Sequence, residues 1–469
     1  MAADTKNNNF KQVAFGIESQ FSQGDPSTLA AADAKLRISS ASAPADDGRI
    51  ATEFLTASFT PEASRTGALT RGLAFETEIA GPTSATVTDQ AQWGKFLRCC
   101  GVRVDTLARI AIGAVADGPF QHLEVVTQAT SAAEGLVIMN TKTGEAYLYL
   151  IETSGEFDGT NVITGATSGA TVTPSGDDVD YGLAYRPWTH ALSEIPLTGS
   201  VTGGPFTAGE KITGGTSGAT GYVWEETADG ATGLLVRHVA GTFESETLTG
   251  ASSGATVSAT GDAAQTHAPS GYMRLFEDGG QQSAKGLRGS FTLNLQSGQP
   301  GALSFDFNGQ NDGHGDAPLL ASIAYERTKG PRFVSATISL DHSTAAPFTE
   351  LPVTGLVVTG QNTLAPVEAA DSGNGVEGMR IGGRDHTVAL TANSVQAGQY
   401  DWLTKHEADT TLELKAQWGT VASNIFIFYA PALQVESGTP GESNALRNDE
   451  WTLRPTGTKD DADWVLCQI

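Results

Sequence analysis

The segment from Gly286 to Gly309 limits the possible folds of this 469-residue chain more than any other part. Apolar and polar residues alternate on both sides of the turn-forming stretch Ser297–Gly301 (SGQPG). Because successive side chains of a strand point to opposite faces, the pattern predicts a β-hairpin with one apolar and one polar face. The apolar set is Phe291, Leu293, Leu295, Leu303, Phe305 and Phe307, and the polar set is Thr292, Asn294, Ser304, Asp306 and Asn308. Since an isolated hairpin is only marginally stable, we expect the apolar face to cover the core of a larger sheet.

The composition favours an all-β protein of several domains. There are 55 glycines, and charged residues make up only 17% of the chain, without long helical runs of Leu, Lys and Glu. The length suggests two to four domains. The formal net charge of -25 disfavours tight binding of nucleic acid, which relies on Lys and Arg to neutralise phosphates. An acidic surface can still face DNA and repel it.

Neither secretion nor membrane insertion is indicated by the sequence. The first ten residues lack a basic region followed by an apolar run, and no stretch reaches the roughly 18 apolar residues of a membrane helix. We therefore expect a protein made soluble in the cytoplasm. Three cysteines, Cys99, Cys100 and Cys467, cannot all pair, and we interpret them as small buried hydrophobic residues rather than reactive or metal-binding groups.

A nine-residue motif recurs three times in the middle of the chain. The copies lie at 163–171 (ITGATSGAT), 212–220 (ITGGTSGAT) and 248–256 (LTGASSGAT), and each follows a phenylalanine. Each copy is typical of a strand end, a Thr/Ser-Gly turn and a return strand, which predicts small β modules. The stretch 181–192 (YGLAYRPWTHAL) resembles neither repeat nor linker, so we expect two insertions, at 116–178 and 193–268, separated by core sequence.

The rest of the chain indicates strands, two short helices and an internal duplication. Trp93, Phe96, Leu97 and Cys100 recur at helical spacing after a possible cap at Thr88, and a second helix is predicted around Asp401–Ala408. Further strands are expected at 53–59, 73–81, 272–278, 333–340, 356–360, 385–395, 411–418 and 424–433. The predicted organisation is an N-terminal arm at 1–50, a first lobe at 51–115, 179–192 and 269–330, the two insertions at 116–178 and 193–268, and a second lobe at 331–469.

Several of these segments resemble one protein family. The helix ending at Trp93–Gly101, the segment Met273–Gly279, the hairpin and the stretch Gly375–Gly383 resemble the tail tube (major tail) proteins of long-tailed bacteriophages with flexible tails. The repeated modules are similar to units found in phage virion proteins. The resemblance implies duplicated β-sandwich or barrel lobes with short flanking helices. It also implies a virion structural protein of the tail, without cofactor or membrane, that contacts itself, other tail proteins and, in transit, the genome DNA.

The same resemblance implies a role for the hairpin and a number of chains in each ring. In such proteins lobes join side by side in stacked rings, and their inner strands form a barrel around a lumen through which DNA passes. The polar set defined above would then face the lumen, where hydroxyl, amide and carboxylate groups give phosphates little to bind. Because a chain with two lobes supplies two ring positions, we expect a homotrimeric, pseudo-hexameric ring, with a true hexamer as the alternative.

A second function class is a carbohydrate-binding adhesin or a decoration protein of the virion. Trp188, Trp224 and Tyr222 could supply stacking platforms for a host-surface polysaccharide at the insertions. The competing interpretation places these aromatic residues in the core of the modules.

Signals for an enzyme are weak, and no catalytic or metal-binding residue is predicted. The stretch Asn311–Asp316 (NDGHGD) loosely resembles a metal-binding turn but lacks the ligand spacing of an EF-hand, so a solvated turn is favoured. Gly250–Gly254 matches the Gly-x-Ser-x-Gly elbow, yet the other copies of the repeat place threonine where Ser252 stands. Asp177, Asp178 and Asp180 are interpreted as a hydrated acidic loop.

Overall fold

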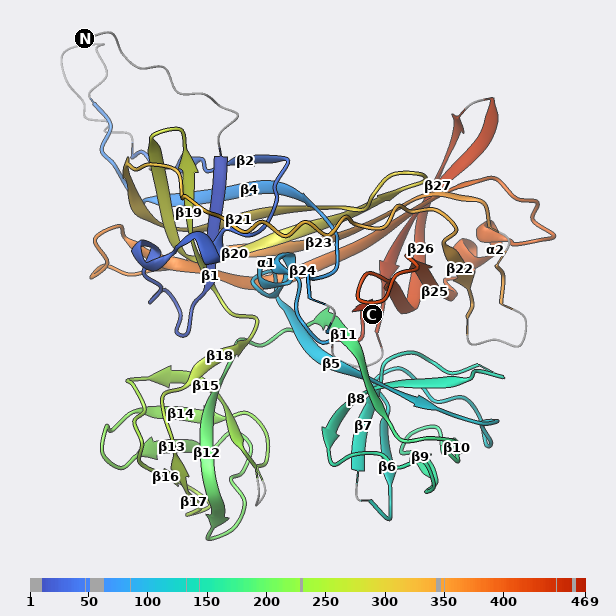
Figure 1. Ribbon diagram of the computed structural model, residues 1–469, viewed down its shortest axis with the longest axis horizontal. Coiled ribbons are helices and arrows are strands. Elements are labelled where there is room, and N and C mark those ends of the chain that lie inside the picture. The colour runs from blue at the N-terminus through green and yellow to red at the C-terminus, as the bar shows by residue number, and fades with distance from the viewer. Residues whose placement is uncertain are drawn as a thin grey trace.

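The computed structural model describes residues 11–46, 48–50, 63–84, 86–131, 133–142, 144–227, 231–342, 347–349, 351–443, 445–457 and 461–469. The protein is mainly β, with 53% strand and 4% helix over this part of the chain, which confirms the predicted class. A large antiparallel sheet forms the upper layer in Figure 1, and two smaller β modules lie below it. No helix within the described ranges is long and apolar enough to cross a membrane.

The central sheet is built from the longest strands of the chain. Its order is β2 and β3 at one edge, then β4, β21, β20, β23, β24, β27 and β26, all antiparallel. The bounds are β2 Ser40–Ser42, β3 Ala45–Asp46, β4 Thr70–Glu78, β20 Gly280–Gln296, β21 Ala302–Asp316, β23 Val353–Glu368, β24 Val376–Asn393, β26 Phe426–Ser443 and β27 Leu446–Pro455. The hairpin predicted from the sequence therefore lies in the middle of this sheet.

A second layer and two helices cover the apolar face of the central sheet. The layer runs β22 (Thr337–Leu340), β25 (Thr411–Trp418), the first half of β26, β28 (Val465–Gln468), β11 (Val179–Pro187) and β5 (Val102–Ala111). The helices are α1 (Gln92–Arg98) and α2 (Trp402–Glu407). Buried side chains from both layers and from α1 form one continuous hydrophobic core, in which Phe96 packs against Phe75 and Phe305. All three cysteines are free and buried, as predicted.

The N-terminal arm predicted at 1–50 is wrong for the described residues 11–46. Strand β1 (Lys11–Ile17) pairs along its whole length with β19 (Gly271–Glu277), which in turn pairs with the first half of β20. Val13 and Phe15 are buried in the main core, and two short 3-10 helices, η1 (Pro26–Thr28) and η2 (Ala31–Asp33), follow. The alternating apolar residues of 13–17 carried the signal for this strand, but its partner lies more than 250 positions away.

Other element predictions differ from the structure mainly at their ends. Helix α1 begins after Ala91, without a side-chain cap, rather than after Thr88, whereas α2 is capped by Asp401, whose carboxylate accepts from the Thr404 N–H at 3.0 Å. The strands predicted at 356–360, 385–395 and 424–433 overlap much longer strands, because pairing with neighbours extends these beyond the apolar segments. The strand predicted at 53–59 lies outside the described residues.

The chain between Leu192 and His267 forms a module with its own sheet and core. Strands β12, β15, β14, β13, β16 and β17 pair in this order and close back onto β12, while β18 lies along β12. Their bounds are β12 Leu192–Thr202, β13 Lys211–Gly214, β14 Thr220–Val223, β15 Gly233–Ala240, β16 Thr247–Gly250, β17 Thr256–Ala259 and β18 Ala264–His267. This closed six-stranded barrel packs around Phe206, Phe243 and Ile212 and spans nearly the same residues as the insertion predicted at 193–268.

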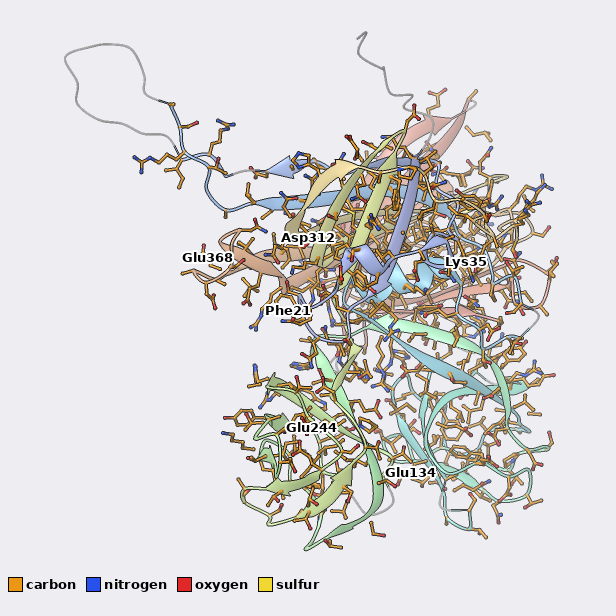
Figure 2. The ribbon with its side chains drawn as sticks, turned by 60° about the vertical axis from the view of Figure 1, so that its left-hand side comes forward. Phe21, Lys35, Glu134, Glu244, Asp312 and Glu368 are labelled. Carbon is orange, nitrogen blue, oxygen red and sulfur yellow. The ribbon has the colours of Figure 1, made fainter. Side chains whose placement is uncertain are left out.

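The chain from Val102 to Pro174 forms the other module, called the first module because it comes first in the sequence, and it repeats the strand order of the barrel. Strands β5, β8, β7, β6, β9 and β10 pair in sequence, and bridges at Ala116–Thr171 and Ile112–Pro174 connect the end of this series back to the chain beyond β5. The bounds are β6 Val125–Gln128, β7 Ala133–Val137, β8 Tyr147–Ser154, β9 Ile163–Gly165 and β10 Thr171–Val172. The core contains Phe120 and Phe157, which precede β6 and β9 as Phe206 and Phe243 precede β13 and β16. Figure 2 shows the two modules beside each other, with Glu134 on one and Glu244 on the other.

The Thr/Ser-Gly turns of the repeats are held by glutamates from other hairpins. Glu246, just before β16, accepts from the backbone N–H groups of Thr216 and Ser217 at 2.6 and 2.8 Å, and Glu210, just before β13, accepts in return from those of Ser252 and Ser253. In the first module Glu124 accepts from Thr167 and Ser168. The two hairpins of the barrel are therefore clamped to each other reciprocally.

The first module contains a fourth, diverged copy of the motif, in which a glutamine stands in place of a glycine. The stretch 126–131 (VTQATS) lies where the hairpin turn begins in the first module, with Gln128 at the position of a motif glycine. Its side chain takes the place of the glutamate: Oε1 accepts from Ser131 Oγ at 2.6 Å and from the Asp158 N–H, and Nε2 donates to the Asn161 carbonyl at 2.7 Å. In the other copies a Cβ at the motif glycine would collide with the glutamate that holds the turn. A turn can therefore be held either by this glutamate or by a glutamine at the glycine position, but not by both.

We predict that Glu246→Gln loosens the turn at 215–218. The Ser217 hydroxyl is the largest cause that lowers the pKa of Glu246, and with the backbone donors it outweighs burial and brings that pKa to about 2. Because the folded-state pKa is depressed, the clamp contributes fully above the ordinary value near 4.5 and is lost as the pH falls toward 2. Amide hydrogen exchange should show protection of Thr216 and Ser217 falling about tenfold in the variant at pH 7.

The neighbouring substitution Glu244→Gln serves as the control for this experiment, because the exposed Glu244 side chain clamps no turn. It should leave protection of both amides unchanged. Equal loss of protection in both variants would contradict the clamp.

Candidate functional site: the polar face of the central sheet

The hairpin of β20 and β21 has the two faces that the sequence predicts. Phe291 lies opposite Phe305, and Leu293 lies opposite Leu303. The structure buries all six residues of the apolar set, with exposed fractions of 4% or less. Phe305 packs between Phe75 and Phe307, with ring centroids at 5.2 and 5.8 Å. This packing fixes the opposite face of the hairpin on the side away from the main core.

The polar set lies on that opposite face and is continued by neighbouring strands. Asn294 and Asp306 are exposed, whereas Thr292, Ser304 and Asn308 are half-buried between their neighbours. The register places one cross-strand row over five strands, from β4 to β24: Glu76, Ser304, Thr292, Thr359 and Thr387. A parallel row runs through Glu78, Ala302, Asn294, Val357, Ala389 and Thr452. The face is therefore a broad surface of hydroxyl, amide and small side chains.

The charge on this face is negative. In the four rows that pass through Ser290, Thr292, Asn294 and Gln296, the described positions include Glu76, Glu78, Asp306 and Glu450 but no lysine or arginine. Glu78 pairs loosely with Arg37, whose Nη2 lies 3.8 Å from Oε2. The surface offers phosphate groups no fixed cation within these rows.

The polar face predicted from the sequence contained only residues of the hairpin and none from β4, β23 or β24. Thr359, Thr387 and Glu76 alternate with buried residues on their own strands, so the signal for exposure was present. Which strands lie side by side depends on pairing between residues up to 240 positions apart, such as Thr70 and Gln310, and no local pattern encodes it.

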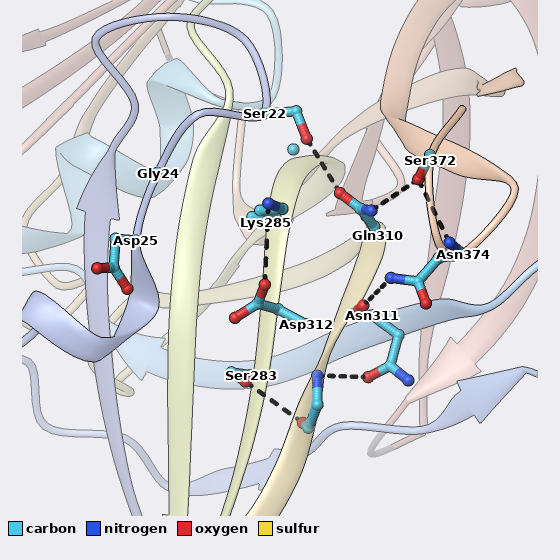
Figure 3. A network of polar contacts seen from close by, with 12 residues as sticks. Ser22, Gly24, Asp25, Ser283, Lys285, Gln310, Asn311, Asp312, Ser372 and Asn374 are labelled. Atoms are coloured by element: carbon cyan, nitrogen blue, oxygen red, sulfur yellow. Dashed lines mark hydrogen bonds and ion pairs between the residues drawn. The ribbon is translucent and has the colours of Figure 1, made fainter. Parts of the chain in front are cut away.

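The stretch Asn311–Asp316 was predicted to be a solvated turn, and this prediction is wrong. It forms the end of β21. Figure 3 shows its surroundings: Gln310 lies between Ser22 and Ser372, and Asn374 Nδ2 donates to the Asn311 carbonyl at 2.6 Å. Asp312 lies 3.9 Å from Lys285 Nζ. These contacts tie β21 to the loop between β23 and β24. Within the described ranges no group of three or more His, Cys, Asp and Glu residues is arranged to hold a metal ion.

The remaining sequence signals for chemistry have structural roles. Ser252, the central residue of the Gly-x-Ser-x-Gly match, donates its hydroxyl to Glu210 at 3.0 Å and so belongs to the reciprocal clamp. In the acidic loop, Asp177 accepts from the Gly159 N–H at 2.8 Å, and Asp178 lies beside Glu152. Burial and this neighbour raise the pKa of Glu152 to about 8.

The three aromatic residues considered for stacking lie outside the core of the barrel module. Tyr222 is 39% exposed, and Trp188 and Trp224 are half-buried. Trp188 packs beneath the guanidinium groups of Arg103 and Arg186, with distances of 4.9 and 5.3 Å to the ring centroid. The interpretation of these residues as module core is therefore wrong. Cations also lie near the other two, since the Arg237 guanidinium is 5.8 Å from the centroid of Trp224 and Lys211 is paired with Tyr222 across the barrel sheet.

Comparison with known proteins adds no relative from which a function could be transferred. The arrangement itself presents a wide polar surface. No protein-family model matches this sequence, and no curated protein matches it either.

Proposed function

We propose that this chain is a structural subunit that assembles with copies of itself into stacked rings, forming a phage tail tube through which DNA passes. The observation that carries the proposal is the central sheet, with one face buried over its middle strands and, on the other side, a polar face whose rows through Thr292 and Asn294 carry acidic residues and no lysine or arginine at the described positions. Outside these rows, Arg288 lies opposite Asn308, and Arg454 pairs with Asp385 and Glu436. Acidic rows of this kind suit the wall of a channel for a polyanion, because they repel phosphates at close range and hold no cation that would bind them.

The order of strands supports two ring positions in each chain. In the first half the central sheet runs β2 and β3, β4, β21, β20, and in the second half β23, β24, β27, β26. In both halves the spatial order is first, second, fourth and third strand along the sequence, and in both a short helix follows the second strand. Three such chains would supply six equivalent positions, and a hexamer of whole chains is the alternative.

The two edges of the central sheet support side-by-side association. At one edge, among the residues that the structure describes, β4 is covered by the short strands β2 and β3 alone. At the other edge, the second half of β26, from Ser437 to Ser443, pairs with β27 on one side and with no described strand on the other. Figure 1 places these edges at opposite ends of the sheet. Joining the edge of one chain to that of the next would close a ring and remove the exposed strand edges that otherwise promote aggregation.

Negative-stain electron microscopy of the purified full-length protein tests this proposal. Rings or tubes with a central channel support it. Particles of single-chain size at all concentrations, with no ring in any condition that stabilises assemblies, would contradict it.

We predict that removal of the barrel module leaves assembly intact. The module has its own core, and its first and last residues, Leu192 and His267, are paired neighbours, so a short Gly/Ser bridge can replace 193–268. The shortened chain should stay soluble and give rings of the same channel diameter in electron microscopy, with a thinner outer wall. Insoluble aggregate under gentle expression would show instead that the module belongs to the folding core.

A further inference from the structure

A cleft lies where the barrel module meets the central part of the protein. It has a volume of about 560 Å³ and is lined by residues of the barrel, of the segment before β12, of β20 and β24, and of the loop after β1. Figure 2 shows Phe21 at the lower border of the central part, above the barrel that carries Glu244. A volume of this size is within the range of sites for small ligands.

The charge of this cleft is opposite to that of the chain. Its described lining includes Arg237, Arg288 and Arg380, together with His190 and His238, and contains no aspartate or glutamate. The whole chain has 53 acidic residues against 28 Lys and Arg, so a lining with this composition is unusual for the molecule. The three guanidinium groups come from three different elements and converge on one space.

Two buried donors in this lining have no protein acceptor. Arg288 is 6% exposed, and its Nε has no hydrogen-bond partner in the described part of the chain. Its electrostatic neighbours are first the buried thiol of Cys99 and then the carboxylate of Glu18. The Glu18 carboxylate accepts instead from the N–H groups of Ser22 and Gly286. The Nε1–H of Trp188 is likewise buried without a partner. Buried polar groups are normally satisfied, so two orphaned donors in one cleft indicate that an acceptor binds there.

Aromatic rings complete the lining. The Arg288 guanidinium lies 5.3 Å from the centroid of the Phe21 ring, and the ring of Trp188 also borders the cleft. The lining residue His190 packs on Trp224, with ring centroids 4.2 Å apart. Aromatic faces of this kind contact the apolar face of a sugar ring while polar groups bind its substituents.

We propose that the cleft between the barrel module and the central part binds a sugar-sized ligand that carries a carboxylate or phosphate group. The guanidinium of Arg288 and the Trp188 Nε1–H bind the oxyanion, Arg237 and Arg380 neutralise its charge from the two walls, and Phe21 contacts the ring. The proposal goes beyond assembly into a tube and does not depend on it.

Isothermal titration calorimetry on the full-length protein, at constant ionic strength, tests this site with three probes. Glucuronate supplies a carboxylate, glucose 6-phosphate supplies a phosphate, and glucose has neither. We expect binding of at least one acidic sugar and none of glucose, and the tighter of the two identifies the anionic group. Failure of both acidic sugars to bind below about 10 mM, or equal binding of glucose, overturns the proposal.

Substitutions locate the binding. Arg288→Gln should weaken affinity about 10- to 100-fold, the effect of losing a charged hydrogen bond. Because Arg288 is buried and its variant can misfold, the exposed Arg237→Gln and Arg380→Gln provide an independent test, each with an expected loss of about 3- to 10-fold. Arg447→Gln, on the distant β27, removes the same charge and should change nothing. Unchanged affinity in both exposed variants would overturn the assignment.

Discussion

Replacing Phe305 by alanine should reduce the free energy of unfolding by about 3–5 kcal/mol, among the largest effects available to a single substitution. The Phe305 ring is 2% exposed and packs against three other phenylalanines, Phe75, Phe96 and Phe307, with ring centroids within 5.8 Å. Truncation leaves a cavity where side chains of β21, β4 and α1 meet in the described core. Urea denaturation followed by tryptophan fluorescence measures the loss.

The adjacent residue is the matched control. Ser304 lies on the same strand but on the polar face, so Ser304→Ala should change the free energy of unfolding by no more than about 0.5 kcal/mol. If the two variants lost similar stability, the assignment of buried and polar faces to β21 would be wrong.

Placing arginine at both Asn294 and Asp306 should slow the passage of DNA about tenfold or more while leaving the fold unchanged. Both side chains are exposed on the polar face, so the substitutions disturb no buried contact. Each adds a fixed cation in the rows that now contain none, and every ring of a stacked tube repeats it. The rate of DNA ejection from assembled particles measures the effect, and circular dichroism checks the fold.

The control for this double variant also adds two arginines, but at positions away from the polar face. Leu403 and Val421 are 59% and 65% exposed on α2 and on the loop before β26, away from the polar face. Leu403→Arg with Val421→Arg should leave ejection at the normal rate. Normal ejection by particles carrying arginine at 294 and 306 would mean that the polar face does not line the channel.

Local patterns were sufficient to predict the parts of the fold that depend on neighbours in sequence. Alternation specified both faces of the hairpin, because the side-chain period of a strand is fixed. Helical spacing around Trp93 located α1, whose Trp93 Nε1 donates to the Ala80 carbonyl at 2.7 Å. The repeated motif identified the module now seen as a closed barrel, since each hairpin carries its own turn residues.

Features that depend on distant partners could not be predicted. Strand β1 was interpreted as part of an arm because its partner β19 lies on the far side of both modules in the sequence. The reciprocal clamp of Glu210 and Glu246 was missed because an acidic residue before a strand is ordinarily solvated. The diverged copy at 126–131 was missed because Gln128 replaces the glycine that marks the motif. In each case a long-range contact determined the role of an inconspicuous residue.

Native mass spectrometry of the smallest closed assembly tests the central claim most directly. We expect a ring of three chains, because the two sets of four strands in the same spatial order would let each chain supply two positions of the proposed ring. Its mass should be close to three times 48.7 kDa, about 146 kDa. Six chains in a single-layer ring would mean that the second half of the chain is not an independent ring position, and a protein that stays monomeric under all assembly conditions would contradict the tube itself.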